Sequence, residues 1–241
     1  KEMQTEQQNF PKTISFVVLA LNEEPFIDNT IQSVLLAAKN SKISDYEIIM
    51  VNDGSSDRTG EIMDQIAERI PKSRTIHNPV NLGLGAAYLK GVKVSSLEYI
   101  MIIAGDNIMP ANSIAQIASQ IGRDDMVLPY MSDDQFRDPI RRYGSSGFTW
   151  LINLMSGNKI KYYNGMVVRR ILFNGEAIDS TGYSLMAECV LKFLKKGATY
   201  FEVGVAHGYP ILAKPNSKAL QLKNLKNLFF SLIKIYQICR N

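Results

Sequence analysis

The sequence predicts an α/β fold in which helices cover both faces of a mostly parallel central sheet. Short apolar runs rich in β-branched residues alternate with segments of helical periodicity, which is the pattern of a parallel sheet buried on both sides. In addition, three of the first four apolar runs end in acidic or amide side chains. Ligands of such sheets bind beyond the carboxyl ends of the strands, so these side chains predict a binding site there.

The first half of the chain supplies the regular part of this pattern. Strands are expected at residues 14–21, 46–51, 74–77 and 99–103. A helix is expected at 25–39, where apolar residues recur at helical spacing and Pro25 suits a first turn. Further helices are expected around residues 62–70 and 86–92. The strands and helices thus alternate as in a doubly wound sheet.

The second half is less regular. Helices are expected at residues 113–121, 143–155 and 184–196, and strands at 126–130, 164–170 and 199–205. A chain of 241 residues without a linker-like tract fits one domain. We therefore expect a flexible leader at 1–12, one domain at 13–222 and a basic amphipathic helix at 223–241. Within the domain, 13–110 would bind nucleotide and 111–222 the acceptor.

Charge and cysteine content limit the partners and the compartment. The net charge of +4 is too small to indicate nucleic acid. The excess positive charge is concentrated after Glu202, where no acidic residue follows. These basic residues form either a surface that binds phosphate or anionic lipid, or a solvated helix face. Cys189 and Cys239 match no disulfide or zinc spacing. The protein is expected in the cytoplasm, either free or bound peripherally to the cytoplasmic face of a membrane.

Three motifs in order carry a family resemblance. VVLALNEE ends the first strand, VNDGSSDRT follows at residues 51–59, and AGDN ends the fourth strand. Together they resemble the nucleotide-binding signature of family 2 glycosyltransferases with the GT-A fold. NLGLGAA at 81–87 resembles a segment of the polyprenyl-phosphate sugar synthases, the group of dolichol-phosphate mannose synthase. The resemblance is firm over 14–110 and weak beyond.

The resemblance implies a site for a nucleotide sugar, either a UDP-sugar or a GDP-sugar. Asp53 would recognise the base, because a carboxylate accepts the imide or amino protons of a base edge, and Gly54 would let the backbone approach it. The glycines of 81–85 would bring backbone N–H groups near phosphate. The implied donor residues are Leu21, Asn22, Glu23, Asp53, Gly54, Ser55, Asp57, Asn81, Gly83, Leu84, Gly85, Gly105 and Asp106. The alternatives are simple turns at 53–54 and 83–85 and a helix N-cap at Asp57.

Asp106 stands where the family places the last carboxylate of its metal-binding Asp-X-Asp element. A hard cation, Mg²⁺ or Mn²⁺, suits carboxylate and phosphate oxygens. The first carboxylate is absent, because this position is Ala104. Glu188 is therefore the candidate second metal ligand. The alternatives are a turn aspartate at 106 and a solvated helical glutamate at 188.

The second half implies an acceptor side. Residues 163–170 and 182–188 resemble its strand and following helix. The cations expected to face phosphate are Arg141, Arg142, Arg169, Lys214 and Lys218, each of which could equally be surface charge. His207 is a candidate general base, or a structural histidine. The catalytic candidates are thus Asp106, Glu188 and His207.

The predicted function is inverting transfer of a sugar to a polyprenyl phosphate. A phosphate acceptor is already ionised at neutral pH and needs no base. Transfer to a saccharide hydroxyl, which needs a base such as His207 or Glu188, is the main rival. A nucleotidyltransferase is disfavoured, because Asn22-Glu23-Glu24 is acidic where such enzymes have a basic, glycine-rich loop. A non-catalytic nucleotide-sugar-binding module and a purely structural domain are the remaining alternatives.

Overall fold

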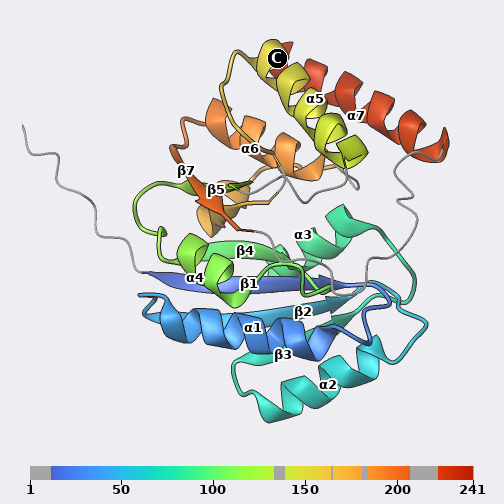
Figure 1. Cartoon of the computed structure of the whole chain (residues 1–241), viewed down its shortest axis with the longest axis vertical. Coiled ribbons are helices and arrows are strands. Elements are labelled where there is room, and N and C mark those ends of the chain that lie inside the picture. The colour runs from blue at the N-terminus through green and yellow to red at the C-terminus, as the bar shows by residue number, and fades with distance from the viewer. Residues whose placement is uncertain (1–11, 133–138, 164, 181–183, 207–221, 241) are drawn as a thin grey trace, which may run out of the picture.

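The computed structural model describes residues 12–132, 139–163, 165–180, 184–206 and 222–240 (Figure 1). The strands are β1 (Thr13–Ala20), β2 (Asp45–Asn52), β3 (Ser73–His77), β4 (Tyr99–Ala104), β5 (Met126–Met131), β6 (Val167–Arg169) and β7 (Tyr200–Val205). The α-helices are α1 (Ile27–Asn40), α2 (Thr59–Arg69), α3 (Leu84–Val94), α4 (Ala111–Ala118), α5 (Pro139–Ser156), α6 (Leu185–Lys195) and α7 (Leu222–Arg240). A 3-10 helix, η1 (Arg170–Phe173), follows β6.

The strands form one sheet in the order β3-β2-β1-β4-β6-β5-β7. All neighbours pair in parallel except β6, which runs antiparallel to both β4 and β5. The predicted α/β class with a mostly parallel sheet is therefore confirmed. Because β6 reverses direction between two strands that share one direction, the carboxyl end of β5 lies at the same edge of the sheet as that of β4.

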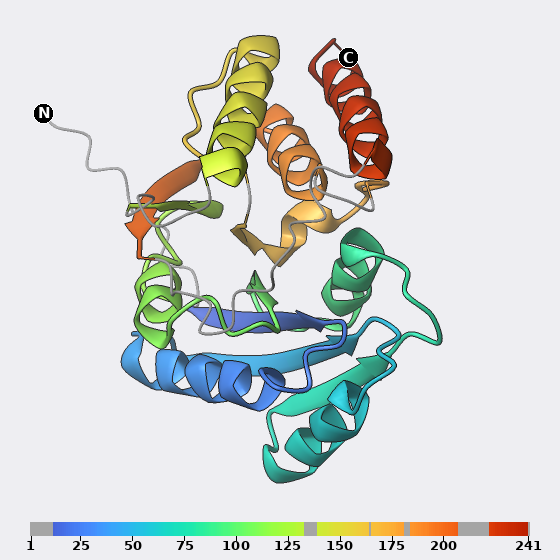
Figure 2. The same ribbon diagram turned by 45° about the vertical axis from the view of Figure 1, so that its right-hand side comes forward.

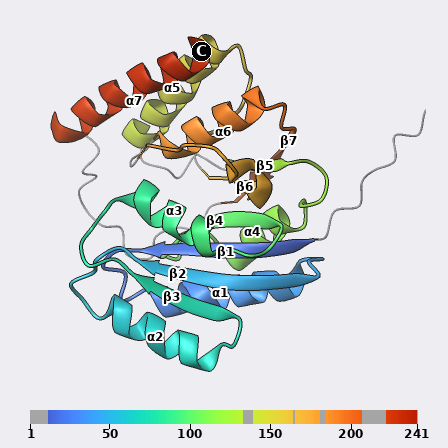
Figure 3. The ribbon, with the colours of Figure 1, turned by 180° about the vertical axis from the view of Figure 1, so that it is seen from behind.

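Both faces of the sheet are covered, as the alternation along β1 shows. Phe16 and Val18 belong to a core with α1, α2 and α4, whereas Val17 and Leu19 belong to a core with α3, α5, α6 and α7. Side chains of a strand alternate between its two faces, so a strand buried on both sides is apolar throughout. Seen from behind, α3 lies on one side of the sheet and α1 and α2 on the other (Figure 3).

Helices α5, α6 and α7 form a group on the side of the sheet away from α1 and α2 (Figure 2). α7 packs against both α5 and α6. Among the described residues, no helix combines the length and the apolar content that crossing a membrane requires.

Several element boundaries differ from those expected, and two of the differences have a clear physical cause. The helix expected from residue 25 begins at Ile27, because the backbone N–H groups of Phe26 and Ile27 both turn onto the carbonyl of Glu23. The strand expected at 164–170 is shortened to the three residues of β6, since the chain turns into η1 at Arg170. Residue 164 lies outside the described residues.

Candidate donor site at the carboxyl edge of the sheet

The loops after β1, β2 and β4 begin side by side. Ala20 is in register with Asn52, and Leu19 with Ala104. The next residues continue this contact, because the backbone N–H of Asp53 donates to the Ala20 carbonyl at 2.9 Å. The strand register thus gathers three polar loops at one edge.

Hydrogen bonds tie the loop after β1 to the loop after β2. The backbone N–H of Asn22 donates to Ser55 Oγ at 3.0 Å, and the N–H of Ser56 donates to Asn22 Oδ1 at 2.8 Å. The N–H of Glu23 donates to Thr59 Oγ1 at 2.8 Å. Asn22 has a positive φ of 56°, a conformation that asparagine tolerates better than most residues. These contacts hold the two loops as one unit.

Asp53 fixes the start of α3 through a buried carboxylate. Its Oδ1 accepts hydrogen bonds from Asn78 Nδ2 at 2.7 Å and from the N–H of Leu82 at 3.0 Å, and its Oδ2 accepts one from the N–H of Gly83 at 3.0 Å. Asn78 is held in turn by Lys90 Nζ at 2.6 Å. Asn78 and Lys90 were not expected from the sequence, because only the fold brings Asn78 to Asp53 and Lys90 to Asn78.

Gly54 allows a close approach between this loop and the segment before α3. Its φ is +76°, and an added Cβ would lie 2.4 Å from the carbonyl carbon of Val80. A side chain at this position would therefore meet backbone and a strained conformation together. The sequence interpretation that Gly54 permits a close backbone approach is consistent with this contact, which here is made to the protein's own chain.

Asp57 stabilises the first turn of α2. Its Oδ1 accepts hydrogen bonds from the N–H of Thr59 at 3.0 Å and from the Thr59 hydroxyl, and its Oδ2 accepts one from the N–H of Glu24 at 3.2 Å. Burial raises the pKa of the Asp57 carboxyl, but these hydrogen bonds outweigh burial and lower the pKa below its ordinary value. Arg58 is the N-cap residue of α2, so Asp57 lies one residue before the cap and satisfies the N–H of Thr59 from there.

Asp106 follows β4 at the centre of the edge and is only partly buried. Its backbone is fixed, because Thr30 Oγ1 donates to the Gly105 carbonyl at 2.8 Å and Gly105 packs against Ala20. Within the described part of the chain, its carboxylate accepts a single long hydrogen bond, from the N–H of Ile108 at 3.3 Å. Asp106 therefore has carboxylate oxygen available to a ligand, in contrast to Asp53.

The residues around Asp106 suit a cation held jointly with phosphate. Carboxylate and phosphate oxygens are the ligands that Mg²⁺ and Mn²⁺ prefer. Within the described residues, no group of three or more His, Cys, Asp and Glu side chains is placed to hold a metal ion, so these residues alone do not offer a closed metal cage. The position two residues before Asp106 is the exposed Ala104. A cation here would depend on the ligand's own oxygens.

The structure brings the predicted donor residues to one edge. They lie on the loops after β1, β2 and β4 and at the start of α3: Leu21, Asn22, Glu23, Asp53, Gly54, Ser55, Asp57, Asn81, Gly83, Leu84, Gly85, Gly105 and Asp106. Val80, Leu82 and Leu84 leave their side chains exposed beside it.

A cavity of about 230 Å³ opens at the end of β5, at the same edge of the sheet. Its lining comes from the end of β5, from α5 and from the loop before β6: Tyr130, Met131, Ser145, Ser146, Thr149, Lys161 and Tyr162. No acidic residue is among them. Lys161 Nζ lies 4.1 Å from the centre of the Tyr130 ring, which places a positive charge at the cavity. The cavity therefore suits an anionic group.

The profile of the family described as Glycosyl transferase family 2 matches residues 15–185, well over half of the chain. The chain belongs to this family. Among its relatives is the uncharacterised glycosyltransferase EpsJ of Bacillus subtilis, which is 42% identical over 39% of this chain and 26% of its own. Dolichyl-phosphate beta-glucosyltransferase ALG5C of Trichomonas vaginalis is 29% identical over 61% of this chain and 48% of its own. The chain thus spans less than half the length of either relative.

Solved structures show the same fold. Glucosyl-3-phosphoglycerate synthase of Mycobacterium tuberculosis, crystallised with Mn²⁺, UDP and phosphoglyceric acid, matches with a TM-score of 0.71 and 17% identity. The match covers 93% of this chain and 78% of the synthase. The fold of this family 2 chain is therefore GT-A.

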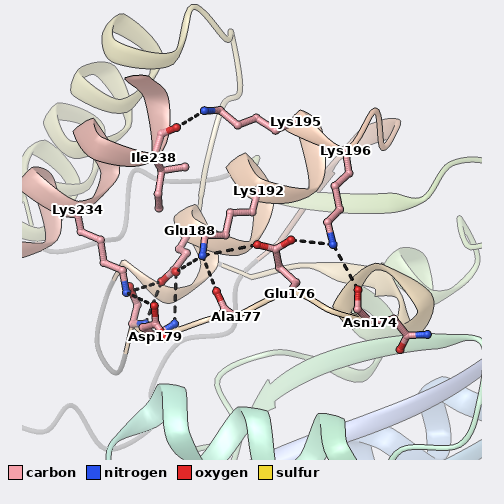
Figure 4. Close-up of polar contacts among 11 residues, drawn as sticks. Asn174, Glu176, Ala177, Asp179, Glu188, Lys192, Lys195, Lys196, Lys234 and Ile238 are labelled. Carbon is pink, nitrogen blue, oxygen red and sulfur yellow. Dashed lines mark hydrogen bonds and ion pairs between the residues drawn. The ribbon is translucent and has the colours of Figure 1, made fainter. Parts of the chain in front are cut away.

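Glu188 lies in an ionic cluster between α6, α7 and the segment before α6 (Figure 4). Its side chain is fully buried, with Oε1 3.0 Å from Lys192 Nζ and Oε2 3.1 Å from Lys234 Nζ. Oε2 also accepts a hydrogen bond from the N–H of Ser180 at 2.9 Å. Contrary to the solvated alternative, the carboxylate is buried, and both of its oxygens have partners within the protein. Its roles as metal ligand and base stay predictions.

We expect Glu188→Gln to destabilise the folded protein by about 3 kcal/mol at pH 7, because two lysines would lose their charged, buried partner. Burial raises the pKa of the Glu188 carboxyl, but hydrogen bonds from Ser180, Lys192 and Lys234 outweigh burial and lower it. A lowered folded-state pKa means stability that is present above the unfolded value of 4.5 and lost as pH falls through the folded pKa. Urea denaturation at several pH values measures this. The difference in unfolding free energy between the wild type and Glu188→Gln should shrink in acid. The exposed control Glu68→Gln should have the unfolding free energy of the wild type at every pH.

Arg169 is placed away from this edge. Its side chain pairs with Glu98 at 2.8 Å and with Asp125 at 3.1 Å. Arg169 is in register with Tyr99, the first residue of β4, whereas Asp106 follows the last residue of that strand. The structure therefore does not bring Arg169 and Asp106 together, contrary to the expectation that this arginine faces the donor or acceptor phosphate. Its ion pairs join β6 to the amino ends of β4 and β5.

Of the other predicted cations, Arg142 lies in the first part of α5 and contacts the ring of Tyr143. Arg141 belongs to the same helix, and its side chain lies outside the described residues. His207, Lys214 and Lys218 also lie outside the described residues. Their roles as base and phosphate ligands stay predictions.

Proposed function

We propose that the chain transfers a sugar from a nucleoside diphosphate, UDP or GDP, to a polyprenyl phosphate with inversion at the anomeric carbon. The observation that carries this proposal is the carboxyl edge of the GT-A sheet, where Asp53, the 81–85 segment and Asp106 converge. Family membership supports sugar transfer. UDP and Mn²⁺ in the crystals of the fold relative support the donor and cation classes.

The donor residues have different roles along the edge of the sheet. The Asp53 carboxylate holds the start of α3, whose first backbone N–H groups face the nucleotide phosphates in this proposal. The base lies beside Asp53, and the diphosphate lies at Asp106. Asp106 would hold a Mg²⁺ or Mn²⁺ ion with the diphosphate oxygens, and this cation would neutralise charge on the leaving group. As a second ligand, Glu188 would have to exchange its contacts with two lysines for the cation.

The transfer step needs no protein base when the acceptor is a phosphate. An acceptor phosphate oxygen forms a bond to the anomeric carbon as the bond from that carbon to the diphosphate breaks, and the electron pair leaves with the nucleoside diphosphate. The Lys161 cavity and Arg142 supply positive charge on the acceptor side, with Arg141, Lys214 and Lys218 as further predicted contacts. The name of the ALG5C relative supports this acceptor class.

Such an acceptor resides in a bilayer, so we also propose peripheral contact of the basic C-terminal segment with a membrane. Within the described residues, neither α5 nor α7 is long and apolar enough to cross it.

Incubation with a nucleotide sugar, Mn²⁺ and either a short-chain polyprenyl phosphate or free saccharides tests the acceptor. Mass spectrometry should find the polyprenyl phosphate heavier by one sugar residue, and NMR of the product should show the anomeric configuration opposite to that of the donor. Lys161→Met should raise the KM for the acceptor about tenfold, since one charge-assisted contact is lost, and leave the donor KM unchanged. Lys159→Met, two residues away and outside the cavity lining, is the matched control. Activity on saccharides alone would establish the hydroxyl-acceptor alternative.

A further inference from the structure

The exposed face of α5 is apolar and aromatic. Tyr143, Trp150 and Leu154 are 68%, 63% and 67% exposed. They are seven and four residues apart, so they lie on one face of the helix. Their exposure is unusual for side chains of this size, and Trp150 is the single tryptophan of the chain.

A second exposed stripe runs along α7. Phe230, Ile233 and Tyr236 are 66%, 40% and 47% exposed and recur every third residue. Ile235, on the other side of the helix, is fully buried in the core that α7 shares with α3, α5 and α6. The inner face of α7 is therefore packed in the core, and much of its exposed outer face is apolar as well.

The two helices lie next to each other and are anchored to the domain. α5 packs against α7, and the pair forms the end of the molecule farthest from α1 and α2 (Figure 1). Lys234 binds the buried Glu188, and Lys195 of α6 donates to the carbonyl of Ile238 (Figure 4). The outer face of the pair is therefore presented by a fixed element of the domain.

The charges of this pair have one sign. Neither α5 nor α7 contains an aspartate or glutamate. Their sequences carry only basic charges: Arg141, Arg142, Lys223, Lys226 and Arg240, besides Lys234, which is paired with the buried Glu188. The rest of the chain therefore holds all 23 acidic residues.

We propose that the outer face of α5 and α7 is a membrane-docking surface that lies in the interface of an anionic bilayer. Aromatic rings and leucine on one face together with lysine and arginine are the features of helices that insert at the headgroup level. The absence of acidic residues matches a negatively charged lipid surface. This inference deepens the proposed contact of the C-terminal segment and rests on it, and it adds α5, with Trp150, as half of the surface.

Trp150 makes the surface directly measurable, because intrinsic tryptophan emission reports this residue alone. We expect the full chain to show a blue shift of emission and to co-sediment with vesicles of mixed phosphatidylcholine and phosphatidylglycerol. Both effects should weaken with added salt and be much smaller with phosphatidylcholine alone, since exposed charges are screened. Leu154→Glu and Ile233→Glu should each reduce vesicle binding at least tenfold. Leu36→Glu, at a 49% exposed position on α1, is the matched control and should bind like the wild type.

Two results would contradict the proposed membrane-docking surface. One is unchanged emission in the presence of anionic vesicles. The other is a blue shift that grows with protein concentration without vesicles, which would mean that a second copy of the chain covers the face. Sugar transfer to a short-chain acceptor in vesicle-free solution is measured in parallel. Binding without transfer would contradict the proposed function alone, and transfer without binding would contradict the surface alone.

Discussion

Asp106→Asn is expected to lower kcat by about 100- to 1000-fold, the scale on which loss of one preorganised charge-stabilising group acts. The substitution removes the negative charge that would hold the cation at the leaving diphosphate. The fold should be unaffected, because the carboxylate accepts a single long hydrogen bond among the described residues and asparagine keeps an acceptor oxygen. Steady-state kinetics over a range of Mn²⁺ concentrations measures the effect.

A matched control makes the same substitution outside the candidate site. Asp124→Asn makes the same change before β5, at the opposite edge of the sheet, and should leave kcat and its Mn²⁺ dependence unchanged. Circular dichroism should give equal melting temperatures for both variants and the wild type. Full metal-dependent turnover by Asp106→Asn would show that Asp106 does not hold the cation.

Asp53→Ala is expected to affect both stability and donor binding. It leaves Asn78 Nδ2 and the N–H of Leu82 without this acceptor, while the N–H of Gly83 keeps only its bond to Asn81 Oδ1. Unsatisfied buried donors cost about 1–3 kcal/mol each, so we expect a loss of about 3 kcal/mol, with relaxation and water satisfying part of the deficit. For a chain of this size, that loss lowers the melting temperature by about 6–12 °C.

The donor KM should rise at least tenfold in the same variant, because the start of α3 would no longer be fixed. Asn78→Ala is the informative comparison, since it leaves Asp53 with both backbone N–H groups. We expect Asn78→Ala to have a smaller effect on both measurements. An unchanged donor KM in a folded Asp53→Ala protein would show that the 81–85 segment does not bind the donor.

The first half of the fold was predictable because its signals are local. β1 and β2 each contain an apolar run rich in β-branched residues, and each ends at a polar loop, so hydrophobic pattern and turn chemistry agree. β6 is different. Its three residues are defined by pairing with β4 and β5, and no local pattern marks where the strand stops or that it runs antiparallel.

Site residues show the same division. Asp53 and Asp106 were predicted from motifs that follow strands. Asn78 and Lys90 were missed because tertiary structure places them: Asn78 contacts Asp53 across 25 residues of sequence, and Lys90 of α3 contacts Asn78. The position of Arg169 was misjudged because strand direction decides which edge a side chain occupies, and the sequence does not state the direction of β6.

Donor binding tests the central claim most directly. The measurement is a thermal-shift panel of UDP-, GDP-, CMP- and dTDP-sugars with and without Mn²⁺. A ligand at about 100 times its dissociation constant adds roughly 2.7 kcal/mol, which corresponds to about 5–10 °C for a chain of this size. We expect a UDP- or GDP-sugar to produce such a shift only with Mn²⁺, and Asp106→Asn to abolish it. The absence of a shift with every nucleotide sugar in the presence of Mn²⁺ would contradict a donor site at the carboxyl edge.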